Sequence, residues 1–180
     1  MRDDTEAVRL AEAGKTAYQQ AEFQKAAKLF MEAAEAYKQS GDELSAAEMA
    51  NNQSVALLQG GNPAASLEAV EGTDTIFANA GDARRQGIAL GNRGAALEAL
   101  GRRSEALSAY QKASELFKDI GEHDLRAPLL RSISSLELRT GGVLSSIVTM
   151  RNHLKEIQHP NGLQKFALKV YQFILNRFGL

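Results

Sequence analysis

One helix-ending pattern occurs three times in this chain, at intervals of forty residues. YKQSGD at residues 37–42 is followed by FANAGD at 77–82 and by FKDIGE at 117–122. Each copy contains an aromatic residue, three further residues, a glycine and an acid. Glycine is favoured where a helix ends with positive φ, and an acidic side chain can accept the free N–H groups of the next helix. The interval therefore predicts repeated helices of fixed length.

Small residues recur at two places when residues 7–40, 47–80, 87–120 and 127–160 are superimposed. In the first half of each repeat they are Gly14, Ser54, Gly94 and Ser134, and in the second half Ala26, Ser66, Ala106 and Ser146. Large apolar residues lie four places after the small residues of the second half, at Phe30, Val70, Tyr110 and Met150. This spacing is typical of close helix crossings. Further turn signals near residues 21–22, 60–62, 101–102 and 141–142 predict that each repeat is an antiparallel helix pair.

The prolines and the acids after the glycines agree with these helix boundaries. Each proline is expected at or near a helix start, where its missing N–H costs little: Pro63, Pro128 and Pro160. The acids expected to accept N–H groups at the next helix start are Asp42, Asp82 and Asp124.

The third repeat resembles a tetratricopeptide repeat (TPR). It carries, in the order and spacing of that family, Leu90, Gly94, Leu97, Gly101, Ala106, Tyr110 and Ala113. The first repeat matches through Leu10, Gly14, Phe23, Ala26, Phe30 and Ala33. The usual unit has about 34 residues, so six more per repeat imply longer helices or longer turns. The longer period resembles the subgroup found in kinesin light chains, mitotic-spindle adaptors and bacterial peptide-sensing regulators.

Periodicity and resemblance together predict an all-α fold: a right-handed α-solenoid of about four TPR-like helix pairs plus a C-terminal helix. The TPR-like array is expected to occupy residues 1–160. Residues 161–180 are expected to form an apolar helix packed on the last repeat.

Stacked helix pairs leave a concave surface lined mainly by their first helices. The residues expected to bind a peptide there are Lys15, Tyr18, Gln19, Glu48, Asn51, Asn52, Val55, Asn92, Ala95, Arg131 and Ser135. Asn52 and Asn92 lie one period apart, and an amide can both donate to and accept from a peptide backbone. The resemblance implies an asparagine ladder that holds an extended peptide. The alternative is that both amides bond a neighbouring helix carbonyl within the stack.

The last residues break the repeat, because LQKFALKVYQFILNRFGL is apolar around most of a helix. A capping helix normally has a polar outer face. This helix is therefore interpreted as packing against the fourth repeat, as forming a homodimer seam, or as folding back into the concave groove. The residues that would mediate self-association are Phe166, Val170, Phe173, Ile174 and Phe178.

Composition and motifs exclude several functions. The 21 basic residues almost balance the 22 acidic ones, so no nucleic-acid partner is expected. The chain has no cysteine, no run of about 18 apolar residues and no apolar signal segment in MRDDTEAVRL, so a cytoplasmic protein without membrane contact is expected. No cofactor or metal is expected. The chain is not expected to be an enzyme, because no nucleophile, base and orienting group occur at usable spacing.

Two functions therefore stay open from the sequence. The first is a non-catalytic adaptor or regulator whose concave groove binds an extended peptide or helix of a partner protein. The second is a self-associating scaffold in which the C-terminal helix mediates homodimerisation. Seven arginines have two possible interpretations. They form either a basic stripe that binds an acidic ligand or an ordinary solvated surface: Arg84, Arg85, Arg93, Arg102, Arg103, Arg131 and Arg139.

Overall fold

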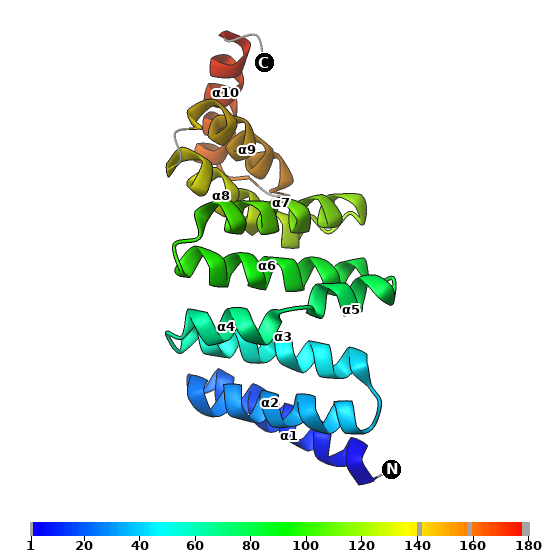
Figure 1. Cartoon of the computed structure of the whole chain (residues 1–180). Coiled ribbons are helices and arrows are strands. Elements are labelled where there is room, and N and C mark those ends of the chain that lie inside the picture. Colours follow the sequence, from blue (N-terminus) through cyan, green and yellow to red (C-terminus); the bar gives the residue numbers. More distant parts are fainter. Residues whose placement is uncertain (1, 140–141, 158–159, 178–180) are drawn as a thin grey trace. The chain divides into compact units, whose positions relative to one another are not determined.

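The computed structural model describes residues 2–139, 142–157 and 160–177, and these residues form helices and turns without a strand. The helices are α1 (Arg2–Gln19), α2 (Phe23–Gln39), α3 (Glu43–Gln59), α4 (Pro63–Val70), α5 (Thr73–Asn79), α6 (Ala83–Ala99), α7 (Arg103–Asp119), α8 (His123–Arg139), α9 (Val143–Glu156) and α10 (Gly162–Arg177) (Figure 1). Short connections between successive helices favour antiparallel neighbours. The all-α class of TPR-like helix pairs followed by a C-terminal helix is confirmed.

The forty-residue interval is present in the helix boundaries. The first helices α3, α6 and α8 begin at residues 43, 83 and 123, and each contains 17 residues. The second helices α2 and α7 also contain 17 residues and begin at residues 23 and 103. The extra length relative to the usual TPR unit therefore lies in longer helices, since the turns between them have only three residues.

Helix caps explain why α3 and α6 begin four residues before the repeat boundaries at 47 and 87 that the sequence pattern suggested. The Asp42 carboxylate accepts a hydrogen bond from the Ser45 N–H at 3.0 Å, and the Asp82 carboxylate accepts one from the Arg85 N–H at 2.8 Å. Both satisfy backbone donors that a helix start leaves free. Gly41 and Gly81, the preceding residues, have φ of 82° and 72°, as expected.

Two expectations about α8 are wrong. Pro128 lies inside α8, and Asp124 lies in its first turn rather than ahead of the helix. Both differences arise because α8 keeps the forty-residue register and begins at His123. Pro128 has no N–H group, so the second turn of α8 lacks one hydrogen-bond donor. The sequence pattern predicts this proline at or near a helix start, where the loss costs little.

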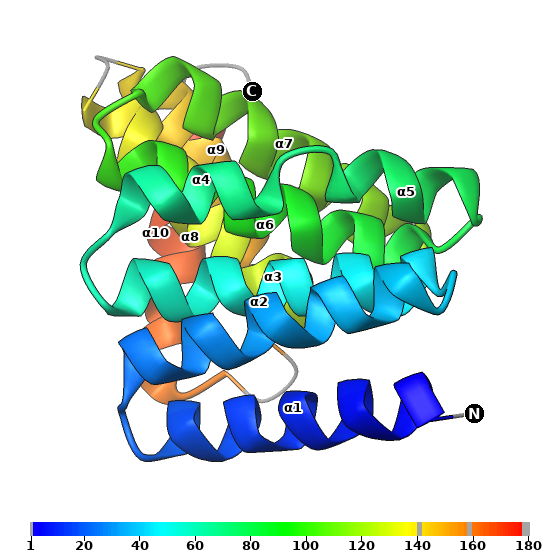
Figure 2. The ribbon, with the colours of Figure 1, turned by 60° about the horizontal axis from the view of Figure 1, so that its bottom comes forward.

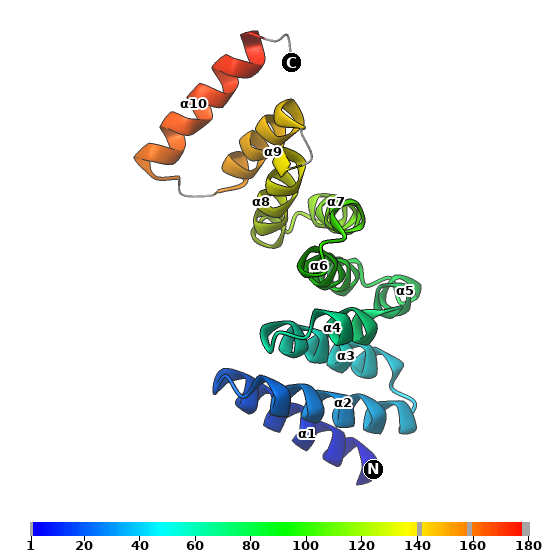
Figure 3. The ribbon, with the colours of Figure 1, turned by 60° about the vertical axis from the view of Figure 1, so that its left-hand side comes forward.

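The second repeat departs from a simple helix pair, because its second helix is divided into α4 and α5 (Figure 3). Gly72 has φ of 77°, and the Thr73 hydroxyl donates to the Val70 carbonyl at 2.8 Å. Positive φ costs a residue with a Cβ about 1–2 kcal/mol, so glycine favours the break at this position. The residues one period away are Glu32 and Lys112, and there the helices continue.

The chain divides into two compact units, Met1–Arg102 and Arg103–Leu180. In unit 1, α2 packs against α1 and α3, while α4 and α5 pack against α3 and α6 (Figure 2). In unit 2, α8 packs against α7 and α9, and α10 packs against α9. The third repeat expected from the sequence is thus shared between the units, with α6 in the first and α7 in the second.

In the first, second and fourth repeats the recurring small residues lie where helices cross, as their spacing predicted. In the second repeat the hydroxyls of Ser54 and Ser66 form a buried hydrogen bond of 2.9 Å. In the fourth repeat Ser134 and Ser146 form the equivalent bond, also at 2.9 Å. The first repeat instead has Gly14, whose backbone lies directly against the Phe30 ring. Repeats with glycine or serine at this place therefore achieve the close crossing by different contacts.

Gly14→Ala is expected to lower the free energy of unfolding by up to about 2 kcal/mol. The new Cβ would lie 2.8 Å from two carbons of the Phe30 ring, which is 3% exposed. Overpacking costs about 1–3 kcal/mol, and the better helix propensity of alanine recovers only about 1 kcal/mol. Urea denaturation followed by circular dichroism measures the change. Gly162→Ala is the control, because nothing lies within 4 Å of the position and no loss is expected; equal effects of the two changes would contradict the prediction.

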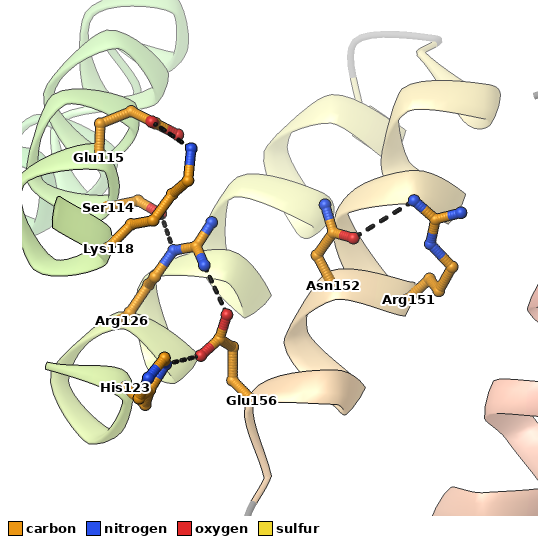
Figure 4. Close-up of polar contacts among 8 residues, drawn as sticks. All are labelled: Ser114, Glu115, Lys118, His123, Arg126, Arg151, Asn152 and Glu156. Carbon is orange, nitrogen blue, oxygen red and sulfur yellow. Dashed lines mark hydrogen bonds and ion pairs between the residues drawn. The ribbon is translucent and has the colours of Figure 1, made fainter. Parts of the chain in front are cut away.

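A polar network connects three helices of unit 2 (Figure 4). The Glu156 carboxylate on α9 accepts hydrogen bonds from Arg126 and from the His123 ring on α8. The Arg126 Nε also donates to the Ser114 hydroxyl on α7 at 3.2 Å. The side chains of Arg126 and Glu156 are each only 12% exposed. The network therefore fixes the positions of α7, α8 and α9 through partly buried charges.

The C-terminal helix α10 is buried through one described side chain, Leu175, while Ile174 is half-buried. Phe166, Val170 and Phe173 are exposed, as is Leu163. Phe178, which the sequence analysis grouped with them, lies outside the described residues.

Candidate functional site

Two adjoining hollows of about 370 and 430 Å³ lie along the first helices of unit 1. The smaller lies between α1 and α3, above Phe30 of α2. The larger lies between α3 and the N-terminal half of α6, above Phe77 of α5. Glu48, Asn52 and Val55 line both, so the hollows form one surface, called here the first-helix groove.

The first-helix groove brings together most of the residues that the helical spacing predicted in this part of the chain. The predicted residues that line it are Lys15, Tyr18, Gln19, Glu48, Asn51, Asn52, Val55 and Asn92. Ala95 lies one turn beyond Asn92 on α6, is half-buried and does not line the hollows. Arg131 and Ser135 belong to unit 2, where they line a hollow of about 350 Å³ that also contains Tyr171 of α10.

The three asparagines of the groove have different hydrogen-bonding roles. Asn51 is 5% exposed and donates through Nδ2 to the Ala47 carbonyl of its own helix at 3.0 Å. Its Oδ1 accepts from Asn92 Nδ2 on α6 at 3.2 Å. The Asn52 amide is half-buried and forms no hydrogen bond with any described residue. Asn52 and Asn92 are therefore equivalent in sequence position but not in function, because Asn92 joins α6 to α3 and Asn52 does not.

Arg85 holds the α6 side of the groove in a fixed arrangement. Its Nε donates to the Asp82 carboxylate at 2.6 Å, and its Nη1 lies 3.3 Å from the Glu48 carboxylate on α3. The guanidinium also lies over the Phe77 ring, 5.1 Å from the centroid. The backbone N–H and the guanidinium of Arg85 both bond Asp82 and hold the pKa of its carboxyl below the usual range. The same pair raises the pKa of Arg85, so these charges are paired before any ligand arrives.

The α1 side of the groove combines an aromatic surface with polar groups. The rings of Tyr18 and Phe23 meet edge to face, with centroids 5.5 Å apart. Lys15 pairs with Glu12 at 2.7 Å, and this hydrogen bond raises the pKa of the ammonium group. Gln19 is exposed and, like Asn52, its amide forms no hydrogen bond with a described residue. Two uncommitted amides therefore lie beside the apolar surface of Tyr18 and Val55.

Sequence reasoning omitted several residues that line the groove near the start of α6. They are Phe77, Asp82, Arg84, Arg85 and Ile88. Ile88 and Arg85 precede Asn92 by four and seven residues, so the helical spacing used for the other residues would have included them if it had been extended towards the N-terminus. The sequence analysis assigns Asp82 to a helix cap and Arg84 and Arg85 to a general basic stripe, and it places none of them in the groove.

The described residues contain no group of three or more His, Asp or Glu side chains that could hold a metal ion. Within the same residues, no helix is long and apolar enough to cross a membrane.

Helix pairs with a forty-residue period and a groove on their first helices define the class: a helical-repeat protein-interaction module. The sequence matches the family described as SNAP, soluble NSF attachment protein, over residues 4–173, and the chain belongs to this family. No curated protein matches the sequence.

Solved structures with the same fold include kinesin light chains, as the forty-residue period suggested. A Podosopora anserina protein described as a kinesin light chain with nearly identical TPR-like repeats has a TM-score of 0.76 and 13% identity, covering 98% of this chain and 90% of that one. A singly substituted form of that protein has a TM-score of 0.75 and 13% identity, covering 99% of both chains. BtubC (BKLC) from P. vanneervenii has a TM-score of 0.72 and 15% identity, covering 99% of this chain and 82% of that one. These similarities establish the TPR-like fold.

Proposed function

We propose that this protein is a non-catalytic, cytoplasmic adaptor whose first-helix groove binds an extended peptide or a helix of a partner protein. The uncommitted amides of Gln19 and Asn52 beside Tyr18 and Val55 are the observation that supports this most directly. A bound main chain presents N–H and C=O groups, and an amide side chain satisfies either kind. The family name, which refers to attachment to NSF, is consistent with a protein that acts by attaching another protein.

The two sides of the first-helix groove differ in what they offer a ligand. On the α6 side Arg85 is paired with Asp82 and Glu48, and Arg84 lines the same side, so two arginines balance two acids and little net charge is offered to a ligand. The α1 side offers the Tyr18 ring and the Gln19 amide. Apolar contacts with Tyr18 and Val55 would supply affinity, and hydrogen bonds to the amides would fix the register. We expect a dissociation constant around micromolar, which corresponds to about 8 kcal/mol.

Asn52→Ala is expected to weaken peptide binding about tenfold without changing stability. Asn52 forms no hydrogen bond with a described residue in the free protein, whereas a bound main chain would lose a partner when the amide is removed, and a tenfold loss corresponds to about 1.4 kcal/mol. Short peptides from the protein's own proteome are screened first, and the best binder is titrated calorimetrically. Asn92→Ala is less informative, because it also deprives the buried Asn51 of its donor.

Gln53→Ala provides the matched control for Asn52→Ala. Gln53 is the next residue on α3, carries the same amide and faces a different cavity. It should leave peptide affinity unchanged. Equal losses for the two variants, or no peptide bound by the intact chain, would disprove the proposed function.

A further inference from the structure

A second and larger cavity, of about 1160 Å³, lies on the opposite side of α3 from the first-helix groove. It is open to solvent and lined by α2, α3 and the α4–α5 segment, and we call it the outer groove. Its apolar surface is mostly small, since six alanines line it: Ala34, Ala36, Ala46, Ala47, Ala50 and Ala69. Small side chains at a helix surface leave room for large side chains of another helix.

The charge of the outer groove is strongly one-sided. Five glutamates line it against a single lysine, Lys38. Glu32 lies 3.8 Å from Lys28, but Glu43, Glu68 and Glu71 are exposed and form no ion pair with a described residue. Carboxylates around an apolar surface favour a ligand that is both apolar and cationic.

Helix α10 has the complementary chemistry. Leu163, Phe166, Val170 and Phe173 are 76, 64, 39 and 72% exposed, and at 100° per residue they lie on one side of the helix. Lys165 and Lys169 lie along one edge of this stripe, and Arg177 extends it by one turn. Among the described helices, α10 is the one without an aspartate or glutamate.

We propose that α10 of one copy docks into the outer groove of a second copy. Phe166 and Phe173 would fill the space above the alanines, between α2, α3 and the divided helix α4–α5. Lys165 and Lys169 would pair with Glu43 and Glu71. Reciprocal docking closes a symmetrical dimer, and one-sided docking gives open chains of copies.

Sedimentation equilibrium of the full chain tests the proposal. We expect the average mass to rise above that of one chain between about 1 and 100 µM protein. Because the contact is partly ionic, association should weaken at least severalfold between about 50 and 500 mM salt. A chain that is monomeric throughout this range overturns the proposal.

Charge exchange tests the contact itself. Two double variants each reverse the charges on one side of the contact: Glu43→Lys with Glu71→Lys, and Lys165→Glu with Lys169→Glu. Each should weaken association about tenfold or more, because it places like charges opposite one another. The chain with all four changes should recover most of the association. Circular dichroism verifies that each variant is folded, and all the changed residues are exposed. Unchanged association in the groove variant, or no recovery in the fourfold variant, overturns the proposed contact.

The matched controls separate this inference from the proposed peptide site. Glu115→Lys with Asp119→Lys makes the same change of charge at exposed residues outside the outer groove and should leave association unchanged. Asn52→Ala should also leave it unchanged, since Asn52 lines the first-helix groove. Equal losses in the Glu115 and Asp119 control would assign the effect to net charge and overturn the proposed contact, without bearing on peptide binding.

Discussion

Phe77→Ala should lower the free energy of unfolding by about 3–5 kcal/mol, the largest effect expected in unit 1. The Phe77 side chain is 1% exposed and packs with Ala47, Val70 and Ala89, where α5 meets α3 and α6. Its removal leaves a cavity that these small neighbours cannot fill. It also removes the ring beneath the Arg85 guanidinium, so the α6 side of the first-helix groove should lose its fixed arrangement.

Urea denaturation followed by circular dichroism measures the stability of this variant. Hydrogen exchange of α3, α5 and α6 then localises the loss to unit 1. Val8→Ala is the control in the same unit, because that side chain is 50% exposed and its truncation should change stability by less than about 0.5 kcal/mol. A loss for Phe77→Ala within the range of the control would contradict the packing described for α5.

Glu156→Ala should lower the stability of unit 2 by about 3 kcal/mol. The change leaves the Arg126 guanidinium, which is 12% exposed, bonded to the Ser114 hydroxyl on α7 but without the carboxylate that neutralises it. Removing one member of a buried ion pair costs about 3–5 kcal/mol, and residual exposure of both groups places the expected value at the lower end. Glu156→Gln keeps a hydrogen-bond acceptor but not the charge, so its loss should be smaller.

The ion pair of Glu115 and Lys118 provides the contrast, because it lies on α7 beside the same network (Figure 4). Its side chains are 62% and 54% exposed, and an exposed pair contributes about 0–1 kcal/mol. Glu115→Ala should therefore have little effect on urea denaturation or on hydrogen exchange of α7, α8 and α9. If Glu115→Ala and Glu156→Ala were equally destabilising, the network would not be what stabilises unit 2.

The fold class and the helix register were predictable because they depend on local chemistry. Gly41 and Gly81 end helices, Asp42 and Asp82 begin them, and the spacing between these signals sets the helix length. The division of the second repeat at Gly72 was missed, although the residue is visible in the sequence. Its effect was not recognised because the apolar pattern of Val70 and Phe77 continues across the break.

The candidate site was only partly predictable. Helical spacing placed Tyr18, Asn52 and Val55 on one surface, and the structure brings them together in the first-helix groove. It did not distinguish the amides of Asn52 and Asn92, because an amide's partner depends on how far two helices are rotated and displaced relative to each other. That Arg131 and Ser135 belong to the same peptide-binding surface is still a prediction from the repeat pattern.

The sequence by itself determined that this chain forms TPR-like helix pairs, since propensity, caps and periodicity act over a few residues at a time. Tertiary structure decided which polar and apolar side chains are used in packing and which remain free. It joins Asn92 to Asn51 and leaves Asn52 without a partner among the described residues. It buries Leu175 and leaves Phe166 and Phe173 exposed. It also forms the outer groove beside the divided helix. These outcomes depend on contacts between segments far apart in the chain, and no local pattern encodes their geometry.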